Sequence, residues 1–315
     1  MSNGNIKELA GQALKKTALN QEAKEYLLHN PVLFNLLLKA ARRYIGGETL
    51  EETLKTRKTL QSQGLMTSLE FMGENVTNVT EANEATEEFL KIIESVKNSQ
   101  RQERVSLDLS HLGIFLNESL GMQNFRKLAK AAQEGDIDLF ISAEGLDKTD
   151  EILEAFIQFS KEFANVHITV QAYLHRSKKD IEQILKNSRG KIRLVKGAYA
   201  GPKELFLQRG RELNDRYVEL LQMVLDSGRY SSIATHDSAI IERIVALLRS
   251  LQVPATQYEF EMLFGIESEL LGDLKKQGHP CRQYIVYGKE WYLYLCNRIS
   301  EYSDNLFRAL IDVMA

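Results

Sequence analysis

The segment IRLVKGAY, residues 192–199, joins a short strand-forming run to a polar turn. Ile192–Val195 is rich in branched apolar residues, which favours a buried strand. Lys196 and Gly197 follow at once, and a glycine there lets the backbone approach another group closely. A strand that ends in such a turn is typical of α/β proteins, whose functional side chains follow the carboxyl ends of parallel strands.

Seven other short apolar runs have the same character, and longer helical patterns separate them. The other expected strands are Ser68–Met72, Val105–Leu109, Ile137–Ile141, His167–Val170, Ser232–Ala234, Tyr258–Met262 and Gln283–Tyr287. The helical patterns include Asn83–Ser95, Gln123–Ala132, Asp150–Phe163, Lys178–Lys186, Glu204–Leu225 and Ala239–Leu251. This alternation predicts parallel strands covered by helices.

Eight strand–helix units in about 250 residues have the size of a TIM-type (βα)8 barrel. An open, doubly wound sheet is the alternative, and it is disfavoured because no G-x-G-x-x-G follows the first strand. Before the barrel, residues 1 to about 62 have helical spacing throughout, for example at Ile6, Leu9 and Leu14. Thr49 and Glu52 form a possible capping box for a helix through Leu60. We therefore expect a helical arm over residues 1–62 and a barrel over residues 63–315.

The composition excludes several classes of protein. Of the 315 residues, 43% are hydrophobic and 26% are charged, so the chain is neither a fibre nor largely disordered. The two cysteines, Cys281 and Cys296, are too few for a disulfide framework or a cysteine-based metal site. A net charge of −3 gives no general attraction to nucleic acid. The sequence has no apolar signal core and no run near the roughly 20 residues of a membrane span, so we expect a cytoplasmic protein.

Polar residues end the expected strands and are candidates for a site at the barrel mouth. They are Glu70, Asp108, Ser142, Gln171, Lys196, His236, Glu261 and Tyr284. Each could instead cap a helix or fill a layer of the barrel. Glu259 and Glu261 are two residues apart in one strand and so share a face. The sequence has no metal-binding histidine motif, no G-x-S-x-G and no phosphate-binding P-loop. These residues alone leave a glycosidase, an aldolase and a cofactor-dependent enzyme open.

Several longer motifs, in order along the chain, resemble those of the proline dehydrogenase family in its bacterial single-function form. They are GETLE at 47–51, LMTSLEFMGENV at 65–76, VQAY at 170–173, RLVKGAY at 193–199, ATHD at 234–237, YEFEMLFGI at 258–266 and YIVYGKEWYLYLCNRISE at 284–301. The resemblance implies a distorted (βα)8 barrel that binds FAD at the carboxyl ends of its strands. It also implies hydride transfer from the carbon beside an amine nitrogen to flavin N5, which yields an imine. Reduced flavin would then pass electrons to a quinone or another acceptor, with at most transient membrane contact.

Carried over residue by residue, the resemblance implies roles for the matching positions. Arg193 would lie beside flavin N5 and stabilise the reduced ring, where a cation offsets the developing negative charge. Gln171 would contact the pyrimidine edge of the ring. The other implied FAD contacts are Ala143, Lys196, Gly197, Ala198, Thr235 and His236. Arg193, Ser142 and Tyr284 hold the positions that the family pattern associates with catalysis.

The expected substrate residues depart from the family pattern at three positions. A lysine that ends the second strand is Asp108 here, an aspartate that ends the third strand is Ser142, and the first of two adjacent arginines is Asn297. The second arginine is kept as Arg298. The remaining substrate positions match the family, and they are Tyr199, Leu263, Tyr284, Tyr294 and Glu301.

These departures change the charge that the substrate would meet. The family set of lysine, aspartate and two arginines sums to +2, whereas Asp108, Ser142, Asn297 and Arg298 sum to zero. Two unit charges about 4 Å apart interact by roughly 4 kcal/mol at an effective dielectric constant near 20. The sequence therefore predicts weak binding of free proline, and a related or modified amine as the substrate. The alternatives are that Asp108 pairs with Arg298 and preserves the fold, or that the chain is a flavin-binding homologue without catalysis.

Overall fold

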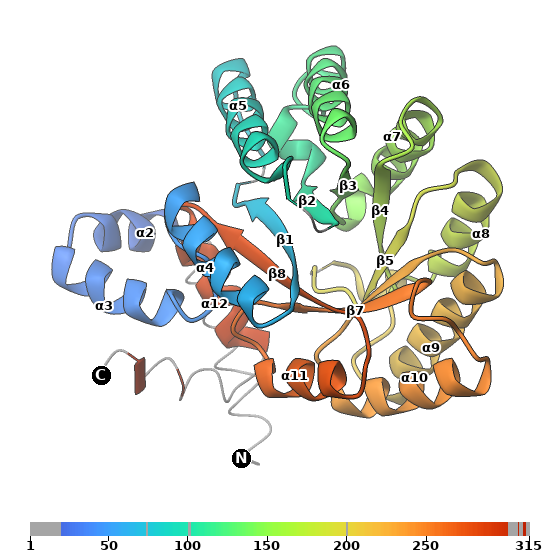
Figure 1. Cartoon of the computed structure of the whole chain (residues 1–315). Coiled ribbons are helices and arrows are strands. Elements are labelled where there is room, and N and C mark those ends of the chain that lie inside the picture. Colours follow the sequence, from blue (N-terminus) through green and yellow to red (C-terminus); the bar gives the residue numbers. More distant parts are fainter. Residues whose placement is uncertain are drawn as a thin grey trace. The chain divides into compact units, whose positions relative to one another are not determined.

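The computed structural model describes residues 20–73, 75–99, 102–199, 201–301, 308 and 311–312. Within these residues, strands β1 to β8 form one closed barrel in sequence order (Figure 1). Neighbouring strands from β1 to β7 pair in parallel, for example Thr169 with Arg193 and Ser232 with Glu259. The predicted (βα)8 barrel is confirmed. The helical pattern around Ile6, Leu9 and Leu14 lies outside the described residues.

Each strand begins and ends within two residues of its predicted bounds. The strands are β1 (Met66–Phe71), β2 (Glu103–Leu107), β3 (Ile137–Ile141), β4 (Val166–Gln171), β5 (Ile192–Val195), β6 (Ser231–Ala234), β7 (Tyr258–Leu263) and β8 (Cys281–Tyr287). The agreement is close because almost every residue of β2, β3 and β4 is buried, and such strands appear in the sequence as apolar runs.

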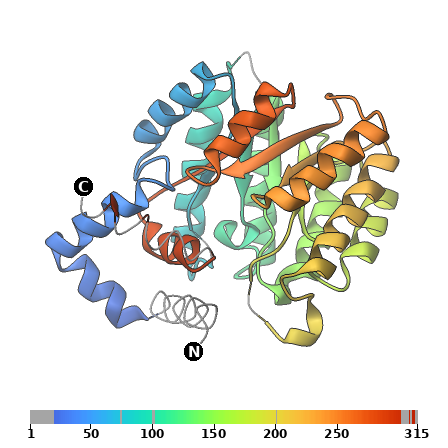
Figure 2. The same ribbon diagram turned by 90° about the horizontal axis from the view of Figure 1, so that it is seen from below.

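Helices connect these strands and pack an apolar stripe against them. They are α5 (Val79–Val96), α6 (Glu118–Glu134), α7 (Thr149–Glu162), α8 (Ser177–Asn187), α9 (Arg211–Asp226), α10 (Ser238–Ser250) and α11 (Ser268–Lys276). Helices α5 to α10 stand outside the strands, as the second view shows (Figure 2). Adjacent helices also touch, since the rings of Phe125 on α6 and Phe159 on α7 stack with centroids 4.1 Å apart.

The expected helix over Glu204–Leu225 begins seven residues late, at Arg211. Only a 3₁₀ turn, η3 (Lys203–Leu205), precedes it. The segment between them pairs with the end of the β4 loop instead. The N–H of His175 donates to the carbonyl of Leu205, and the N–H of Leu207 donates to the carbonyl of Tyr173. Helical periodicity cannot reveal such a tertiary backbone pairing.

The chain divides into two compact units. One consists of residues 60–262 and 266–284 and includes helices α5 to α11. The other consists of residues 1–59, 263–265 and 285–315, and its described helices include α2 (Gln21–Leu28), α3 (Pro31–Ala41) and α12 (Trp291–Glu301). Within this second unit the ring of Trp291 packs edge-on against Phe34, with centroids 5.1 Å apart.

The predicted capping box at Thr49 is half formed. The N–H of Glu52 in α4 (Leu50–Ser62) donates to the hydroxyl of Thr49 over 3.3 Å. The Glu52 carboxylate, however, accepts from the N–H of Glu48 rather than of Thr49, at 2.8 Å. Between α3 and α4 the chain is not helical, and Gly46 and Gly47, which break the helical pattern of the sequence, lie in this break. Among the described residues, no helix combines the length and the apolar character that crossing a membrane requires.

Candidate active site

Three predicted site residues meet where β3 and β4 end. Ser142 follows β3, and its N–H donates to the carbonyl of Leu107 at 2.9 Å. The buried amide of Gln171, the last residue of β4, donates to the carbonyl of Glu144 at 3.2 Å. Ala143 and Gln171 also border one small cavity of about 30 Å³, room for about one water molecule. The hydroxyl of Ser142 is buried and has no hydrogen-bond partner within the described residues.

The loop after β5 rests on an aromatic ring. Gly197 has φ +106°, and a Cβ atom there would lie 2.1 Å from the Tyr173 ring. The hydroxyl of Tyr173 donates to the carbonyl of Tyr199 at 3.0 Å. Ala198 between them is exposed. Only glycine meets both the left-handed backbone and the close approach, so this ring fixes the shape of the K-G-A-Y loop.

Lys196 faces the loop that follows β6. Its ammonium lies 2.6 Å from the Asp237 carboxylate, which also caps α10 by accepting the N–H of Ile240 at 3.1 Å. Burial would raise the pKa of Asp237, but Lys196 and the cap hold it below its ordinary value. Thr235 is buried and accepts the N–H of Asp237 at 3.2 Å. His236 is half-buried beside it. The chain thus places a cation, a hydroxyl and an imidazole on adjoining strand ends.

Arg193 lies inside the barrel and is only 3% exposed. Its guanidinium forms a two-point ion pair with Glu261 of β7, at 2.7 and 3.2 Å. It also donates to the hydroxyl of Ser106 at 2.8 Å. The ring centre of Tyr284 in β8 is 4.8 Å from the guanidinium carbon. Three predicted site residues, Arg193, Glu261 and Tyr284, are therefore in one cluster.

Asp108 comes directly after β2 and is half-buried at the start of the 3₁₀ turn η1 (Leu109–Leu112). The N–H of His111 donates to its carbonyl at 3.2 Å. The imidazole of His111 is buried against the ring of Phe71, and burial lowers its pKa to about 4. The histidine three residues after Asp108 is therefore neutral at neutral pH.

The other predicted substrate residues belong to the second compact unit. Leu263 ends β7 and is half-buried, as are Tyr294, Asn297 and Arg298 on α12. The guanidinium carbon of Arg298 lies 5.0 Å from the ring centre of Tyr294, one helical turn away. Glu301 is the last residue of α12, and its side chain lies outside the described residues.

The donors at these strand ends fit an anionic nucleotide cofactor. Lys196 offers a half-buried cation, and Ala198, which follows Gly197, is exposed. The buried hydroxyl of Ser142, which has no partner among the described residues, offers a further polar contact. A metal ion has no such support, since among the described residues no three His, Cys, Asp or Glu side chains are grouped to hold one.

Several residues that shape this region were not predicted from the sequence. Glu144 is buried and accepts the N–H of Ser110 at 3.1 Å, which ties the β3 loop to the β2 loop. Arg104 and Arg282 are buried in the barrel and pair with Glu259 at 2.5 and 2.9 Å. The sequence contained one signal for Arg104 and Arg282, because both are charged residues within apolar strands, and such residues in a closed barrel need partners.

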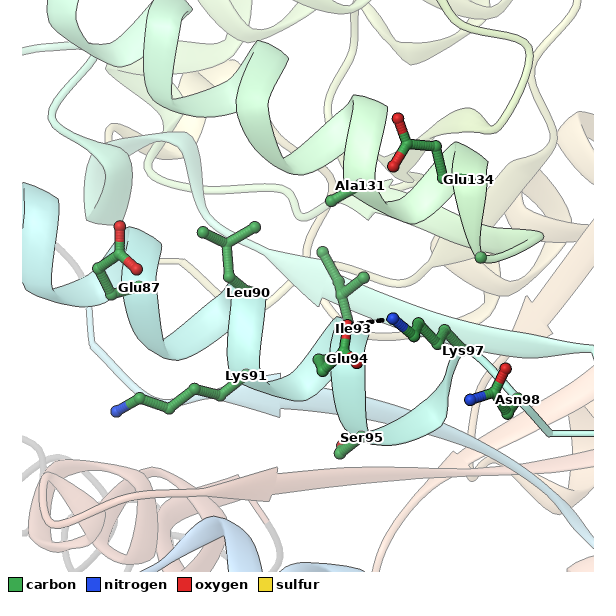
Figure 3. Close-up of a pocket in the computed structure, with 11 residues that line it drawn as sticks. Glu87, Leu90, Lys91, Ile93, Glu94, Ser95, Lys97, Asn98, Ala131 and Glu134 are labelled. Atoms are coloured by element: carbon green, nitrogen blue, oxygen red, sulfur yellow. Dashed lines mark hydrogen bonds and ion pairs between the residues drawn. The ribbon is translucent and has the colours of Figure 1, made fainter.

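A separate groove of about 760 Å³ lies between the carboxyl-terminal halves of α5 and α6 (Figure 3). Leu90 and Ile93 line it from α5 and Ala131 from α6, and Lys97 and Glu94, which also line it, form an ion pair at 2.5 Å. Since α6 ends just before β3 begins, this groove is near the amino ends of the strands. It contains none of the predicted site residues.

Comparison with known proteins gives consistent matches. The sequence profile described as proline dehydrogenase matches residues 53–308. A Bacillus subtilis protein described as proline dehydrogenase 1 is 34% identical over 265 residues, or 84% of this chain and 87% of that protein. A Deinococcus radiodurans protein described as proline dehydrogenase is 30% identical over 270 residues, again 84% and 87%.

A solved structure supports the fold independently. Proline utilization A from Bdellovibrio bacteriovorus, inactivated by N-propargylglycine, superposes with a TM-score of 0.76 at 18% identity. The match covers 84% of this chain but only 34% of the other, so this chain spans about a third of its length. At this identity the likeness shows the barrel fold alone.

Proposed function

The chain belongs to the proline dehydrogenase family and is an oxidoreductase that acts on a CH–NH bond, and we propose that it is FAD-dependent and oxidises a compact secondary amine. The observation that carries the proposal is the loop after β5, where Lys196 and Gly197 follow the buried Arg193 in the R-L-V-K-G-A-Y motif. A buried guanidinium, a cation and a glycine turn within five residues of the chain suit a flavin nucleotide.

Each cofactor residue has a distinct task in this proposal. Lys196 would bind phosphate, while Gly197 and Ala198 would offer backbone along it. Gln171, Ala143, Thr235 and His236 would hold the ring and sugar through amide, backbone, hydroxyl and imidazole groups. Bound FAD supplies the acceptor for the hydride that leaves the substrate. Arg193 would face the charge that forms on reduction, and Tyr284 beside it would limit water.

The substrate residues favour an amine other than free proline. Asp108 would attract the cationic amino group on binding, and Asn297 would contact an amide or carbonyl, because its side chain both donates and accepts. Arg298 would hold one carboxylate. Tyr199, Leu263, Tyr294 and Glu301 would supply the packing and polar contacts that the family pattern keeps. Ser142, smaller than the aspartate of the family pattern, leaves its polar atom available.

An anaerobic flavin-bleaching screen tests the proposal. Purified protein loaded with FAD is mixed with proline, hydroxyproline, proline amide, pipecolate or a diamine, and loss of flavin absorbance is recorded. We expect bleaching by a charge-altered amine at concentrations at which proline, weakened at least about 100-fold, has little effect. Efficient bleaching by proline contradicts the altered specificity, and a chain that binds no FAD contradicts the cofactor.

A charge-reversing variant tests the specificity directly. Asp108→Lys combined with Asn297→Arg restores the cations of the family pattern, so proline turnover should rise. Asp108→Asn is the matched control, since it removes the negative charge without adding a cation and should recover only part of the gain. No gain in the double variant removes the charge argument.

The second candidate is a flavin-binding homologue without catalysis. It is favoured by the three departures at Asp108, Ser142 and Asn297 beside complete cofactor motifs. A yellow protein that no amine bleaches supports this candidate. The retained Tyr284 and Tyr294 favour an active enzyme, since binding of flavin alone would not require both. For an active enzyme, a quinone or another acceptor would take up the electrons.

A further inference from the structure

The guanidinium of Arg193 is held on every side. Its Nε and Nη2 atoms donate to the two carboxylate oxygens of Glu261, at 2.7 and 3.2 Å. Nη2 also donates to Ser106 at 2.8 Å, and Nη1 donates to Thr169 at 3.3 Å. The ring of Phe140 lies 4.7 Å away on one face. With so many partners, the guanidinium has one defined position and orientation.

Glu261 is as tightly held as its partner. Its Oε2 atom accepts from the hydroxyl of Ser232 at 2.6 Å and from Arg104 at 3.2 Å, and the residue is 2% exposed. Burial would raise the pKa of Glu261, but the two guanidinium groups offset it and lower that pKa to about 2. The carboxylate is therefore ionised at neutral pH, and part of the Arg193 charge is neutralised in place.

We propose that Glu261 is a positioning residue that fixes Arg193 inside the barrel and lowers the reduction potential of the bound flavin by neutralising part of the Arg193 charge. This inference rests on the proposed function, in which Arg193 faces the reduced ring. A free guanidinium would favour the negatively charged, reduced flavin strongly. A carboxylate bonded to that guanidinium at two points weakens the effect, because the ion pair as a whole has little net charge.

The same strand contains a matched control. Glu259 lies two residues before Glu261 on the same face, about 6.6 Å nearer the amino end of β7. It is also buried and ionised, but it pairs with Arg104 and Arg282, at 2.5 and 2.9 Å. Replacing either glutamate by glutamine removes one negative charge from the same interior. Only the replacement at Glu261 removes the charge that is bonded to Arg193.

The test compares Glu261→Gln with Glu259→Gln in FAD-loaded protein. The readouts are the flavin midpoint potential, measured by dye equilibration, FAD affinity and the thermal unfolding midpoint. We expect Glu261→Gln to increase the equilibrium constant for two-electron reduction about tenfold, a rise of about 30 mV. Glu259→Gln should change this constant less than about threefold, although we expect both variants to unfold at lower temperature.

Equal shifts in the two variants, or no rise in Glu261→Gln with FAD bound, overturn the inference and leave the proposed function standing. A wild-type chain that binds no FAD overturns both. If Glu261→Gln does not fold, Ser232→Ala replaces it. This variant removes the hydrogen bond that Ser232 donates to the Glu261 carboxylate. The carboxylate then neutralises more of the Arg193 charge, so the midpoint potential of the flavin should fall. A potential that stays constant or rises in Ser232→Ala contradicts the inference.

Discussion

The two ends of the barrel interior use the same residue types for different purposes. Toward the amino ends of the strands, Glu259 pairs with Arg282, which also donates to the carbonyl of Thr67 at 2.6 Å, and both side chains are fully buried. Toward the carboxyl ends, Arg193 and Glu261 are surrounded by hydroxyls and the ring of Tyr284. Because Arg282 bonds both to Glu259 and to the backbone of β1, the first pair has a structural role. The second pair borders the strand ends where the candidate site residues gather.

Arg104 bridges these two pairs, and its loss is the largest effect that we predict. Its Nη1 atom lies 2.5 Å from Glu259 and 3.2 Å from Glu261. Arg104→Gln would leave two buried carboxylates short of a partner, so we expect the free energy of unfolding to fall by about 3–5 kcal/mol. Urea unfolding followed by circular dichroism measures this loss. A loss below about 1 kcal/mol would mean that Arg282 and Arg193 alone neutralise the two carboxylates.

Two buried histidines extend the comparison to pH. Near the amino end of β4, His167 donates from Nε2 to Asp138 at 2.9 Å, because its Nδ1 atom accepts the N–H of Lys191. At the carboxyl end of β2, burial lowers the pKa of His111 to about 4, and its Nδ1 atom has no partner among the described residues. The histidine with a charged partner, His167, and the histidine without one, His111, therefore lie at opposite ends of the barrel.

Protonation of His111 should make the protein less stable in mild acid. An unfolded histidine takes up a proton near pH 6.5, whereas folded His111 does so only near pH 4, so stability is highest above pH 6.5 and falls between these values. Between pH 7 and pH 5 we expect a loss of about 2 kcal/mol from this residue. His111→Gln should flatten that part of the curve in urea titrations. Parallel curves for the two proteins would assign the acid sensitivity to other groups.

The sequence predicted the strands and much of the strand-end set because both depend on local patterns. Ile137–Ile141 and Ile192–Val195 were predicted at their observed bounds, since continuous apolar runs mark buried strands. The common face of Glu259 and Glu261 also followed from strand alternation. Their partners did not, because Arg104 and Arg193 come from β2 and β5, far along the chain. Pairing across a barrel depends on closure, which no local window contains.

Alanine variants at two glycines test whether the loop after β5 contributes to the binding of FAD. Gly197→Ala places a methyl group 2.1 Å from the Tyr173 ring at φ +106°, so we expect a loss of about 2 kcal/mol in stability and weaker binding of FAD. Gly228→Ala is the control at the amino end, because φ is also positive, at +76°, but nothing lies within 4 Å. It should cost about 1 kcal/mol and leave FAD affinity unchanged. Equal FAD affinity in both variants would separate the Gly197 loop from the cofactor.

The smallest loss of stability that we predict is for an exposed ion pair. Arg126 on α6 and Glu162 at the end of α7 form a two-point pair at 2.9 and 3.0 Å, with side chains 40% and 37% exposed. Its geometry is as good as that of Arg193 and Glu261, but water screens the charges. Arg126→Gln should therefore change the free energy of unfolding by less than about 1 kcal/mol, in the same urea assay as Arg104→Gln. A loss comparable to that of Arg104→Gln would show that geometry, and not burial, decides the strength of these pairs.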